Sequence, residues 1–475
     1  MFAKIQRVHF VGIGGIGMSG IAEVLLNMGY KVSGSDLKAS ALTHRLASLG
    51  ATTFEGHRAD NLAGAEVVVT SSAIAGDNPE VAAAHANHIP VIPRAEMLAE
   101  LMRLKYGIAI AGMHGKTTTT SMVAAVLAAG GLDPTVVIGG RVDAMGSNAR
   151  LGKSQYFVAE ADESDRSFLK LWPILSVVTN IDREHMDCYR DMADVEETFI
   201  HFLDQVPFYG MVVACKDNDA LRCILPRVRR RVMTYGAREG SDFLISRMRG
   251  AVGDDGVFAS RFTVNYRGRD LGEFLLHVPG EHNVRNATAA IAVGFGLDIP
   301  IDQIREGLAN FRGVDRRFQL KGRANGVTVI DDYGHHPTEI RATLAAARQC
   351  GFRRIHVIFQ PHRYTRTQLL LDEFAAAFGD ADTVAVLDIY AASEAPIEGI
   401  SGKLLADKIA KARSGDATYV ASFATAVESV AASTDPGDLV LTLGAGNVSQ
   451  LGPLVLEELE RVAAHETNLH PFSQT

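Results

Sequence analysis

Short hydrophobic runs alternate along most of the chain with longer stretches in which apolar residues recur at helical spacing. The runs are rich in β-branched residues, which is typical of strands buried on both faces. They lie at 8–13, 66–71, 107–112, 156–161 and 175–180. Because strands that alternate with helices form parallel sheets covered by helices, the pattern predicts a protein of the α/β class.

Changes in this pattern suggest where domains begin and end. A new strand with its own glycine loop starts after residue 105, and further strands follow the segment FRGVDRRFQ near residue 311. Between 242 and 278, apolar and polar residues nearly alternate, which predicts antiparallel strands added to the middle part. A chain of 475 residues has room for about three domains. We therefore expect domains at 1–105, 106–311 and 312–475.

Composition excludes several functional classes. Lys and Arg number 47 against 55 Asp and Glu, so no overall basic field favours a nucleic-acid partner. No apolar run is long enough for insertion into a membrane, and the basic run 226–231 is interpreted as a solvated face. The cysteines lack zinc or disulfide spacing, which predicts free thiols and a cytoplasmic protein. They are Cys188, Cys215, Cys223 and Cys350.

The segment GMHGKTTTT, between a strand and an Ala-rich stretch, predicts a phosphate site. Backbone N–H groups from Gly112 to Thr117 can cradle phosphates, Lys116 adds a positive charge, and the Thr117 hydroxyl can bind Mg²⁺. Position 110 is Ile where the longer phosphate-loop motif has Gly, so this is a shortened form. The alternative is a helix that begins with Gly-Lys-Thr and binds no phosphate.

Acidic and imidazole groups follow the next two strands. Glu160 ends the strand 156–161 at the edge that carries the phosphate loop, which favours it as an oxygen ligand of Mg²⁺. His185 follows the strand 175–180 and is either a second metal ligand or a structural histidine. The other acids after Glu160 are interpreted as a polar loop. They are Asp162, Glu163 and Asp165.

A second glycine loop lies near the amino terminus. GIGGIG at 12–17 follows a strand and fits G-x-G-x-x-G, and Asp36 ends the next strand. This arrangement creates a pocket for a pyrophosphate, which both UDP-sugars and NAD(P) carry. A nucleotide-diphosphate site, an NAD(P) site and a glycine turn needed only for packing all remain open from these residues alone.

Taken together, the motifs resemble the ATP-dependent Mur ligases of cell-wall peptidoglycan synthesis. The resemblance covers nearly the whole chain, through VHFVGIGGIGMSGIAEVL, SGSD, SSAI, GMHGKTTTT, EADESD, TNIDREHMD, GEHNVRNATAA, RRFQ, DDYGHHPTE, FQPHRYTRT and LGAGNVS. It implies a Rossmann-like UDP-sugar-binding domain, a central P-loop ATPase-like domain that binds ATP, and a Rossmann-like amino-acid-binding domain. It also implies a reaction in which the lactyl carboxylate of UDP-N-acetylmuramate becomes an acyl phosphate and is joined to L-alanine, releasing ADP and phosphate.

The resemblance also assigns residues to roles. For ATP it implies Gly112, Met113, His114, Gly115, Lys116, Thr117, Thr118, Asn283, Asn286 and Asp332. For the UDP-sugar it implies Gly14, Gly15, Ile16, Gly17, Asp36 and Ser71, and for the amino acid Tyr333, Arg363 and Arg366. Thr117, Glu160 and His185 would hold Mg²⁺, and Lys116, Glu160, His185 and His335 would be catalytic. His335 would take the amine proton or only position substrate, and His336 is expected to pack or to cap a helix.

Two alternatives to alanine addition remain. Family members that add later amino acids carry a carbamylated lysine after the histidine motif, whereas no Lys lies between His185 and Phe208. A recycling ligase that attaches a preformed tripeptide to UDP-N-acetylmuramate is the nearer alternative, and an NAD-dependent dehydrogenase is the more distant one. We expect a monomer or a weak homodimer.

Overall fold

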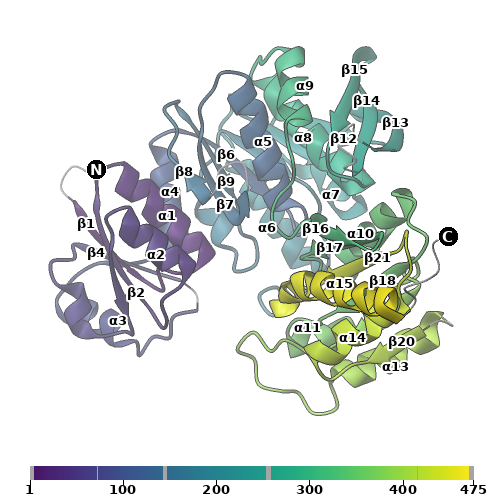
Figure 1. The fold of residues 1–475 in the computed structure, drawn as a ribbon. Helices are drawn as coiled ribbons and strands as arrows, with labels where there is room; N and C mark the ends of the chain where they lie inside the picture. The colour runs from purple at the N-terminus through teal and green to yellow at the C-terminus, as the bar shows by residue number, and fades with distance from the viewer. Residues whose placement is uncertain (1–4, 72, 143–146, 253–257, 414–415, 470–475) are drawn as a thin grey trace. The chain divides into compact units, whose positions relative to one another are not determined.

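The computed structural model describes residues 5–71, 73–142, 147–252, 258–413 and 416–469 (Figure 1). By its internal contacts the chain divides into two compact units. The first comprises Met1–Arg247, Phe262–Leu276 and Arg285–Val314, and the second Met248–Arg261, His277–Val284 and Asp315–Thr475. Within the described ranges, no helix is both long enough and apolar enough to cross a membrane.

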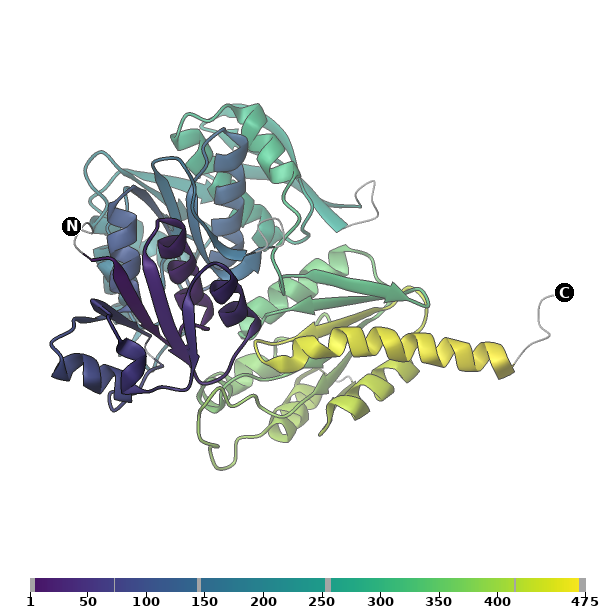
Figure 2. The same cartoon turned by 60° about the vertical axis from the view of Figure 1, so that its left-hand side comes forward.

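The first unit begins with a five-stranded parallel sheet in the order β3-β2-β1-β4-β5. Its strands are β1 (Arg7–Val11), β2 (Lys31–Asp36), β3 (Thr52–Glu55), β4 (Val67–Thr70) and β5 (Val91–Pro93). Its helices are α1 (Ile16–Asn27), α2 (Ala41–Ser48), α3 (Pro79–Ala86) and α4 (Arg94–Arg103), and these elements come forward in Figure 2 in purple and blue. The strand order reverses direction at β1, so the loops after β1 and β4 border the crevice where such sheets bind ligands.

The same unit contains a ten-stranded sheet in the order β15-β14-β13-β12-β11-β10-β6-β9-β7-β8. The strands are β6 (Tyr106–Ala111), β7 (Thr135–Val142), β8 (Ser147–Arg150), β9 (Tyr156–Glu160), β10 (Leu175–Val178), β11 (Met211–Cys215), β12 (Val232–Gly236), β13 (Phe243–Val252), β14 (Phe258–Tyr266) and β15 (Arg269–Leu276). From β12 to β7 in the order of the sheet, neighbouring strands run parallel. Only two residues join β14 to β15, which is the length of a hairpin connection. The predicted strands and the predicted antiparallel addition are thereby confirmed.

Helices accompany this central sheet: α5 (Lys116–Ala129), α6 (Met192–Asp204), α7 (Asp219–Ile224), α8 (Glu281–Gly296) and α9 (Ile301–Ala309). The strands β6, β10 and β11 are apolar along almost their whole length and are buried. A parallel strand covered by helices on both sides requires this composition. Their carboxyl ends lead into the loops that carry the predicted phosphate and metal residues.

The second unit is built on a six-stranded sheet in the order β16-β17-β21-β18-β19-β20. Its strands are β16 (Gln319–Ala324), β17 (Val327–Asp332), β18 (Ile355–Phe359), β19 (Thr383–Val386), β20 (Asp416–Tyr419) and β21 (Leu439–Leu443). Only β16 runs antiparallel to its neighbour. Its helices are α10 (Pro337–Gln349), α11 (Tyr364–Leu369), α12 (Leu371–Ala375), α13 (Gly402–Arg413), α14 (Phe423–Ser433) and α15 (Leu451–Leu469).

Adjacent residues of these strands point to opposite faces, so the sheet has a hydrophobic core on each side. Val329 and Ile358 belong to one core, and their chain neighbours Ile330 and Val357 belong to the other. This double covering confirms the Rossmann-like character expected for the carboxyl-terminal part. The limits predicted for the three domains stay a prediction.

Candidate active site

The second glycine loop links β6 to α5 with two residues in the left-handed region. Gly112 has φ of 127° and Gly115 has φ of 82°. A Cβ on Gly112 would lie 2.1 Å from Thr179 Oγ1, so no larger residue fits there. Gly115 is the N-cap of α5, and within the described residues no side chain caps this helix. Its first N–H groups therefore face outward, as an anion site requires.

Lys116 lies over this loop in a buried ionic contact. Its Nζ lies 2.6 Å from Glu163 Oε1 and 2.8 Å from Oε2, and it donates to the carbonyl of Gly112 at 2.8 Å. Burial would lower the pKa of Lys116, but the charges of Glu163 and Asp162 outweigh burial and raise that pKa. The interpretation of Glu163 as part of a polar loop was wrong, because its side chain is fully buried and pairs with the lysine.

Asp162 and Arg94 form a second ion pair beside Lys116. Arg94 Nη2 lies 3.0 Å from Asp162 Oδ2. Burial would raise the pKa of Asp162, but the positive charge of Lys116 and hydrogen bonds from Ser164 lower it, so Asp162 is not a plain loop residue either. Sequence reasoning missed Arg94. A signal was present, because an arginine as the first residue of a helix opposes the helix dipole and needs a nearby anion.

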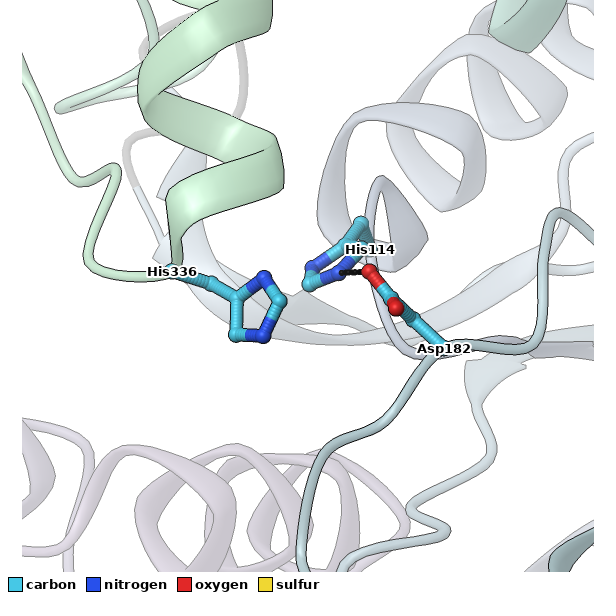
Figure 3. Close-up of side chains that lie close together, drawn as sticks. All are labelled: His114, Asp182 and His336. Carbon is cyan, nitrogen blue, oxygen red and sulfur yellow. Dashed lines mark hydrogen bonds and ion pairs between the residues drawn. The ribbon is translucent and has the colours of Figure 1, made fainter. Parts of the chain in front are cut away.

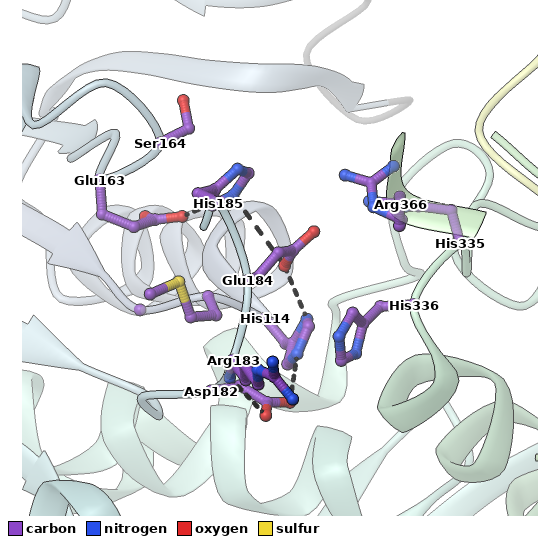
Figure 4. A network of polar contacts seen from close by, with 12 residues as sticks. His114, Glu163, Ser164, Asp182, Arg183, Glu184, His185, His335, His336 and Arg366 are labelled. Carbon is purple, nitrogen blue, oxygen red and sulfur yellow. Dashed lines mark hydrogen bonds and ion pairs between the residues drawn. The ribbon is translucent and has the colours of Figure 1, made fainter. Parts of the chain in front are cut away.

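Glu160 and His185 occupy different surroundings in this site. Glu160 ends β9, and its Oε1 accepts a hydrogen bond of 2.7 Å from the N–H of Gly139. His185 Nε2 lies 3.6 Å from Glu163 Oε1 and 4.0 Å from Glu184 Oε2. Figure 4 marks both contacts with dashed lines. His185 also has a positive φ of 57°. Their shared role in holding Mg²⁺ stays a prediction.

His114 is held by the segment that follows β10 in the chain. Its Nε2 lies 2.9 Å from Asp182 Oδ2 (Figure 3), and its Nδ1 lies 3.8 Å from Glu184 Oε2. Its backbone is held as well, because the Asn180 amide accepts from the His114 N–H and donates to its carbonyl, each at 2.9 Å. The loop between Gly112 and Gly115 is therefore held in one conformation by the residues after β10.

The remaining ATP residues of the prediction lie around the same loop, with two exceptions, Asn283 and Asp332, which belong to the second unit. Asn286 on α8 touches the loop, since a Cβ on Gly115 would lie 2.9 Å from its Oδ1. Met113 and Thr118 are buried, and Thr117 is half-buried as the second residue of α5. Asn283 belongs to the second unit, where its Nδ2 donates to the carbonyl of Pro279 at 2.8 Å.

The first glycine loop is organised by β2. The N–H groups of Gly12 and Ile13 donate to the carbonyl of Ser35 at 2.8 and 3.0 Å. The N–H of Gly14 donates to Asp36 Oδ2 at 2.8 Å, and a Cβ on Gly14 would lie 2.8 Å from that same oxygen. The structure thus brings Asp36 onto the loop, as the sequence pattern predicts.

The first glycine loop and Lys116, at the end of the second glycine loop, line one cavity of about 330 Å³ in the first unit. Its polar and glycine lining is Gly15, Gly17, Ser71, Arg94, Lys116, Gly139, Glu160 and Asp162. This volume falls within the usual range for ligand pockets. Residues predicted for the UDP-sugar therefore share a cavity with Lys116 and Glu160, although nearly one hundred positions separate the two loops in the sequence.

The second unit gathers the other predicted residues at the carboxyl end of β17. Asp332 accepts hydrogen bonds from the N–H groups of Gly334 and Phe318 at 2.8 and 2.7 Å, and burial raises its pKa. His335 Nδ1 lies 3.2 Å from Glu339 Oε2. His336 is the N-cap of α10 and accepts from the N–H of Thr338, which confirms its expected role.

The residues predicted for the amino acid lie near a run of aromatic rings in this unit. The Tyr333 and His335 rings are 5.2 Å apart, His335 and His362 are 6.0 Å apart, and His362 stacks on Tyr390 at 5.5 Å. Arg366 Nη1 lies 3.2 Å from His362 Nδ1, and Arg363 Nε lies 2.5 Å from Glu394 Oε1. Burial, and then the nearby positive charges, lower the pKa of His362 to about 3. Sequence reasoning did not find His362.

Comparisons with known proteins identify the family. Residues 7–106 match the Mur ligase family catalytic domain, 110–294 the Mur ligase middle domain, and 316–446 the Mur ligase glutamate ligase domain. The chain therefore belongs to the Mur ligase family.

Individual relatives span the full length. A UDP-N-acetylmuramate–L-alanine ligase of Koribacter versatilis is 74% identical over 98% of this chain and 100% of its own. The crystal structure of a UDP-N-acetylmuramate-alanine ligase from Thermotoga maritima, 30% identical, superposes with a TM-score of 0.80 over 97% of this chain and 99% of that one. A murein peptide ligase from Psychrobacter arcticus, 24% identical with a TM-score of 0.68 over 96% and 99%, shows the shared fold alone.

Proposed function

We propose that this enzyme joins L-alanine to the lactyl carboxylate of UDP-N-acetylmuramate at the expense of ATP, in the synthesis of peptidoglycan precursors. The cavity shared by the two glycine loops is the observation that carries the proposal. A pyrophosphate bound at the first loop would place the attached sugar acid beside Lys116, where the γ-phosphate of ATP is expected. The high identity to named alanine ligases supports this choice of substrates.

The chemistry requires activation because a carboxylate resists attack by an amine. Transfer of the γ-phosphoryl group to the lactyl carboxylate gives an acyl phosphate, which the amine of alanine then attacks, releasing phosphate. In our proposal the N–H groups at the start of α5 and the ammonium of Lys116 stabilise the charge on the transferred group. Glu163 holds the ammonium over the loop until phosphate takes its place.

The residues of the cavity also fit a magnesium ion. Glu160 offers carboxylate oxygens beside Lys116, and Thr117 offers a hydroxyl at the start of α5, both of which are hard donors. We propose that these two residues and His185 hold Mg²⁺, which when bound neutralises charge on the phosphates. Asn283, Asn286 and Asp332 complete the nucleotide site in this proposal.

The second unit would supply the amino acid. We propose that Arg363 and Arg366 bind the carboxylate of alanine beside Tyr333, because the planar guanidinium matches a carboxylate. His335 would accept or direct the amine proton, since its ring already lies next to Glu339. The proposal includes a cytoplasmic enzyme that is a monomer or a weak homodimer, organised as the three domains predicted from the sequence.

One assay separates this proposal from its alternatives. Phosphate and ADP release from ATP would be measured with UDP-N-acetylmuramate and, in turn, L-alanine, glycine, L-serine, a preformed tripeptide or no amine. The proposal expects the highest kcat/KM with L-alanine and a matched amount of amide product. Preference for the tripeptide would establish the recycling reaction instead, and NAD reduction without ADP release would establish a dehydrogenase.

A further inference from the structure

The side of the central sheet where its parallel strands begin carries several exposed apolar side chains. The segments that lead into β6, β10 and β11 lie at the amino ends of these strands, away from the two glycine loops. Five large side chains there are exposed: Leu104 (50%), Tyr106 (44%), Trp172 (56%), Phe208 (93%) and Tyr209 (66%). We refer to these five residues as the aromatic edge.

The aromatic edge forms a continuous surface because its strands are neighbours. In the sheet β11, β10 and β6 are adjacent, and strands are about 4.8 Å apart, so the row extends roughly 10 Å. The rings of Phe208 and Tyr209 are 5.3 Å apart. A groove of about 480 Å³ lies among Leu104, Tyr106, Trp172 and Tyr209. Apolar patches of this kind on an otherwise polar surface mark interaction sites.

Basic residues dominate the segments that form this patch, although Glu96, Glu100 and Glu197 on neighbouring helices pair with Lys170, Arg103 and Arg227. The segments 103–106, 153–156, 170–174 and 226–231 contain Lys or Arg but no Asp or Glu, and 206–209 contains no charged residue. The last of these, interpreted from sequence as a solvated face, precedes β12, the neighbour of β11. Arg230 joins it to the aromatic edge, because its guanidinium donates to the carbonyls of Asp204 and Val206, just before Phe208.

Not all of these cations are available to a partner. Lys105 Nζ already donates to Thr135 Oγ1 and to the carbonyls of Gly152 and Ser154. Arg229 and Arg231, by contrast, are exposed, and within the described residues neither guanidinium forms an ion pair, although the Asp204 carboxylate accepts a hydrogen bond from the Arg229 backbone N–H. Positive charge at this edge is a local feature, since the whole chain has a net charge of -8.

We propose that the aromatic edge binds the surface of an anionic lipid bilayer. Trp and Tyr favour the boundary between headgroups and acyl chains, and Lys and Arg beside them attract anionic headgroups. The exposed rings lie at or just before the amino ends of neighbouring strands of one sheet, so that one lipid surface can meet them together. Binding would be interfacial and shallow. It would leave the cavity at the opposite ends of the same strands open to substrates, and it does not depend on the proposed reaction.

The chain offers a built-in probe, because Trp172 is its single tryptophan. The full-length enzyme would be titrated with vesicles of phosphatidylglycerol and phosphatidylcholine, and with vesicles of phosphatidylcholine alone, while tryptophan emission is recorded. We expect a blue shift with the anionic vesicles that weakens as salt is raised, and no shift with the neutral ones. Brominated lipids should quench the shifted emission.

Variants test which residues are responsible. Arg229→Glu with Arg231→Glu should weaken binding to anionic vesicles by at least about tenfold. Phe208→Ser with Tyr209→Ser should reduce cosedimentation with these vesicles to a similar extent. The matched control reverses two exposed lysines on α13, Lys403→Glu with Lys411→Glu, and should bind as the unchanged enzyme does. All three variants should retain wild-type kcat and KM.

Several results would overturn the proposal. Emission that is unaffected by anionic vesicles would do so, and so would an equal loss of binding in the α13 control. If soluble polyglutamate shifts the emission and vesicles do not, the edge is a site for an acidic protein and not for a bilayer. If the serine variant proves unstable in thermal melting, the arginine variant alone decides the outcome, because its side chains are exposed and unpaired with acids.

Discussion

The two glycine loops of the first unit share a backbone design but differ in their charges. Each follows a strand, each leads into a helix that no side chain caps in the described structure, and both line one cavity. The first loop is held by the carbonyl of Ser35 and the carboxylate of Asp36, whereas the second carries Lys116 among buried acids. In our proposal the first turn holds a diphosphate and the second serves phosphoryl transfer, and Lys116 is the residue that distinguishes them.

A buried carboxylate lies behind each loop. Glu80 accepts hydrogen bonds from Ser35, Asn61 and the N–H of Arg58, and its side chain is fully buried next to His9. Burial would raise its pKa, but the hydrogen bond with His9, together with those from Ser35, Asn61 and Arg58, lowers that pKa to about 2. The Glu163 carboxylate is instead paired with the ammonium of Lys116. The first loop is thus supported by a hydrogen-bond network and the second by an ion pair.

Replacing the lysine should have the largest effect. In Lys116→Ala, ADP release and amide formation should fall at least about 1,000-fold, because the charge on the transferred phosphoryl group loses its nearest cation. The readout is a coupled ADP assay together with product chromatography. Lys403→Ala, an exposed lysine of the second unit, is the control and should be fully active. If Lys116→Ala retained more than a tenth of wild-type activity, the lysine would not distinguish the second glycine loop from the first.

Stability should reveal the ion pair independently of catalysis. Lys116→Ala leaves the buried Glu163 without its cation, which should lower the free energy of unfolding by about 3 kcal/mol. Adding Glu163→Gln to Lys116→Ala should restore most of that loss without restoring activity. Urea unfolding of both single variants and the double variant gives the coupling energy. Additive effects would show that the two side chains do not depend on each other.

Glycine replacements should distinguish the loops by strain. Gly112→Ala should cost about 3 kcal/mol of stability, because it forces a positive φ and places Cβ 2.1 Å from Thr179 Oγ1. Gly14→Ala should cost about 1 kcal/mol, because only side-chain atoms of Asp36 and Thr43 have to move, while the KM for the UDP-sugar rises. Gly29→Ala has a positive φ and open space, so it isolates the backbone cost. Equal losses of unfolding free energy in the Gly112 and Gly14 variants would show that the two loops do not differ in strain.

The Glu80 network predicts a pH dependence. The folded pKa of about 2 lies below the ordinary value of 4.5, so its stabilisation is complete above about pH 5 and is lost as the pH falls towards 2. Glu80→Gln should therefore be less stable than wild type by about 2 kcal/mol at neutral pH, allowing for solvent screening. The gap should narrow in acid unfolding curves. A gap that stays constant down to pH 3 would contradict the lowered pKa.

Arg94 provides the smallest and most specific test. It lines the cavity beside the first loop and pairs with Asp162, so Arg94→Ala should raise the KM for UDP-N-acetylmuramate about tenfold while kcat changes less. Arg103→Ala, at the other end of the same helix, is the matched control and should leave both constants unchanged. If kcat falls and KM is unchanged, Arg94 belongs with the phosphoryl-transfer loop.

Much of the fold could be predicted because it depends on local patterns. The strands at 107–112 and 175–180 follow from continuous apolar runs, and the glycine loop after the first of them follows from its motif. The roles of Glu163 and Arg94 could not be found in this way. Three acids crowd the segment after β9, and only the position of Lys116, on another strand's loop, decides which is buried.

Long-range neighbours explain the other omissions. His362 acquires its lowered pKa from rings and arginines that the sheet of the second unit brings together. The basic run 226–231 was predicted to be exposed, and most of it is, but its proximity to Phe208 depends on strand order. The position of Asn286 against Gly115 likewise depends on how α8 packs. Spacing along the chain contains none of this information.

If the two glycine loops serve one reaction, formation of the acyl phosphate should depend on both ATP and the UDP-sugar, and this can be measured directly. In a single turnover without alanine, ATP labelled in the γ-phosphate and UDP-N-acetylmuramate should form a labelled acyl phosphate, and borohydride should trap the acid as its alcohol. We expect this product with the wild-type enzyme and none with Lys116→Ala. If ATP is hydrolysed at the same rate with and without the UDP-sugar, and no alcohol forms, the two glycine loops do not act on one reaction.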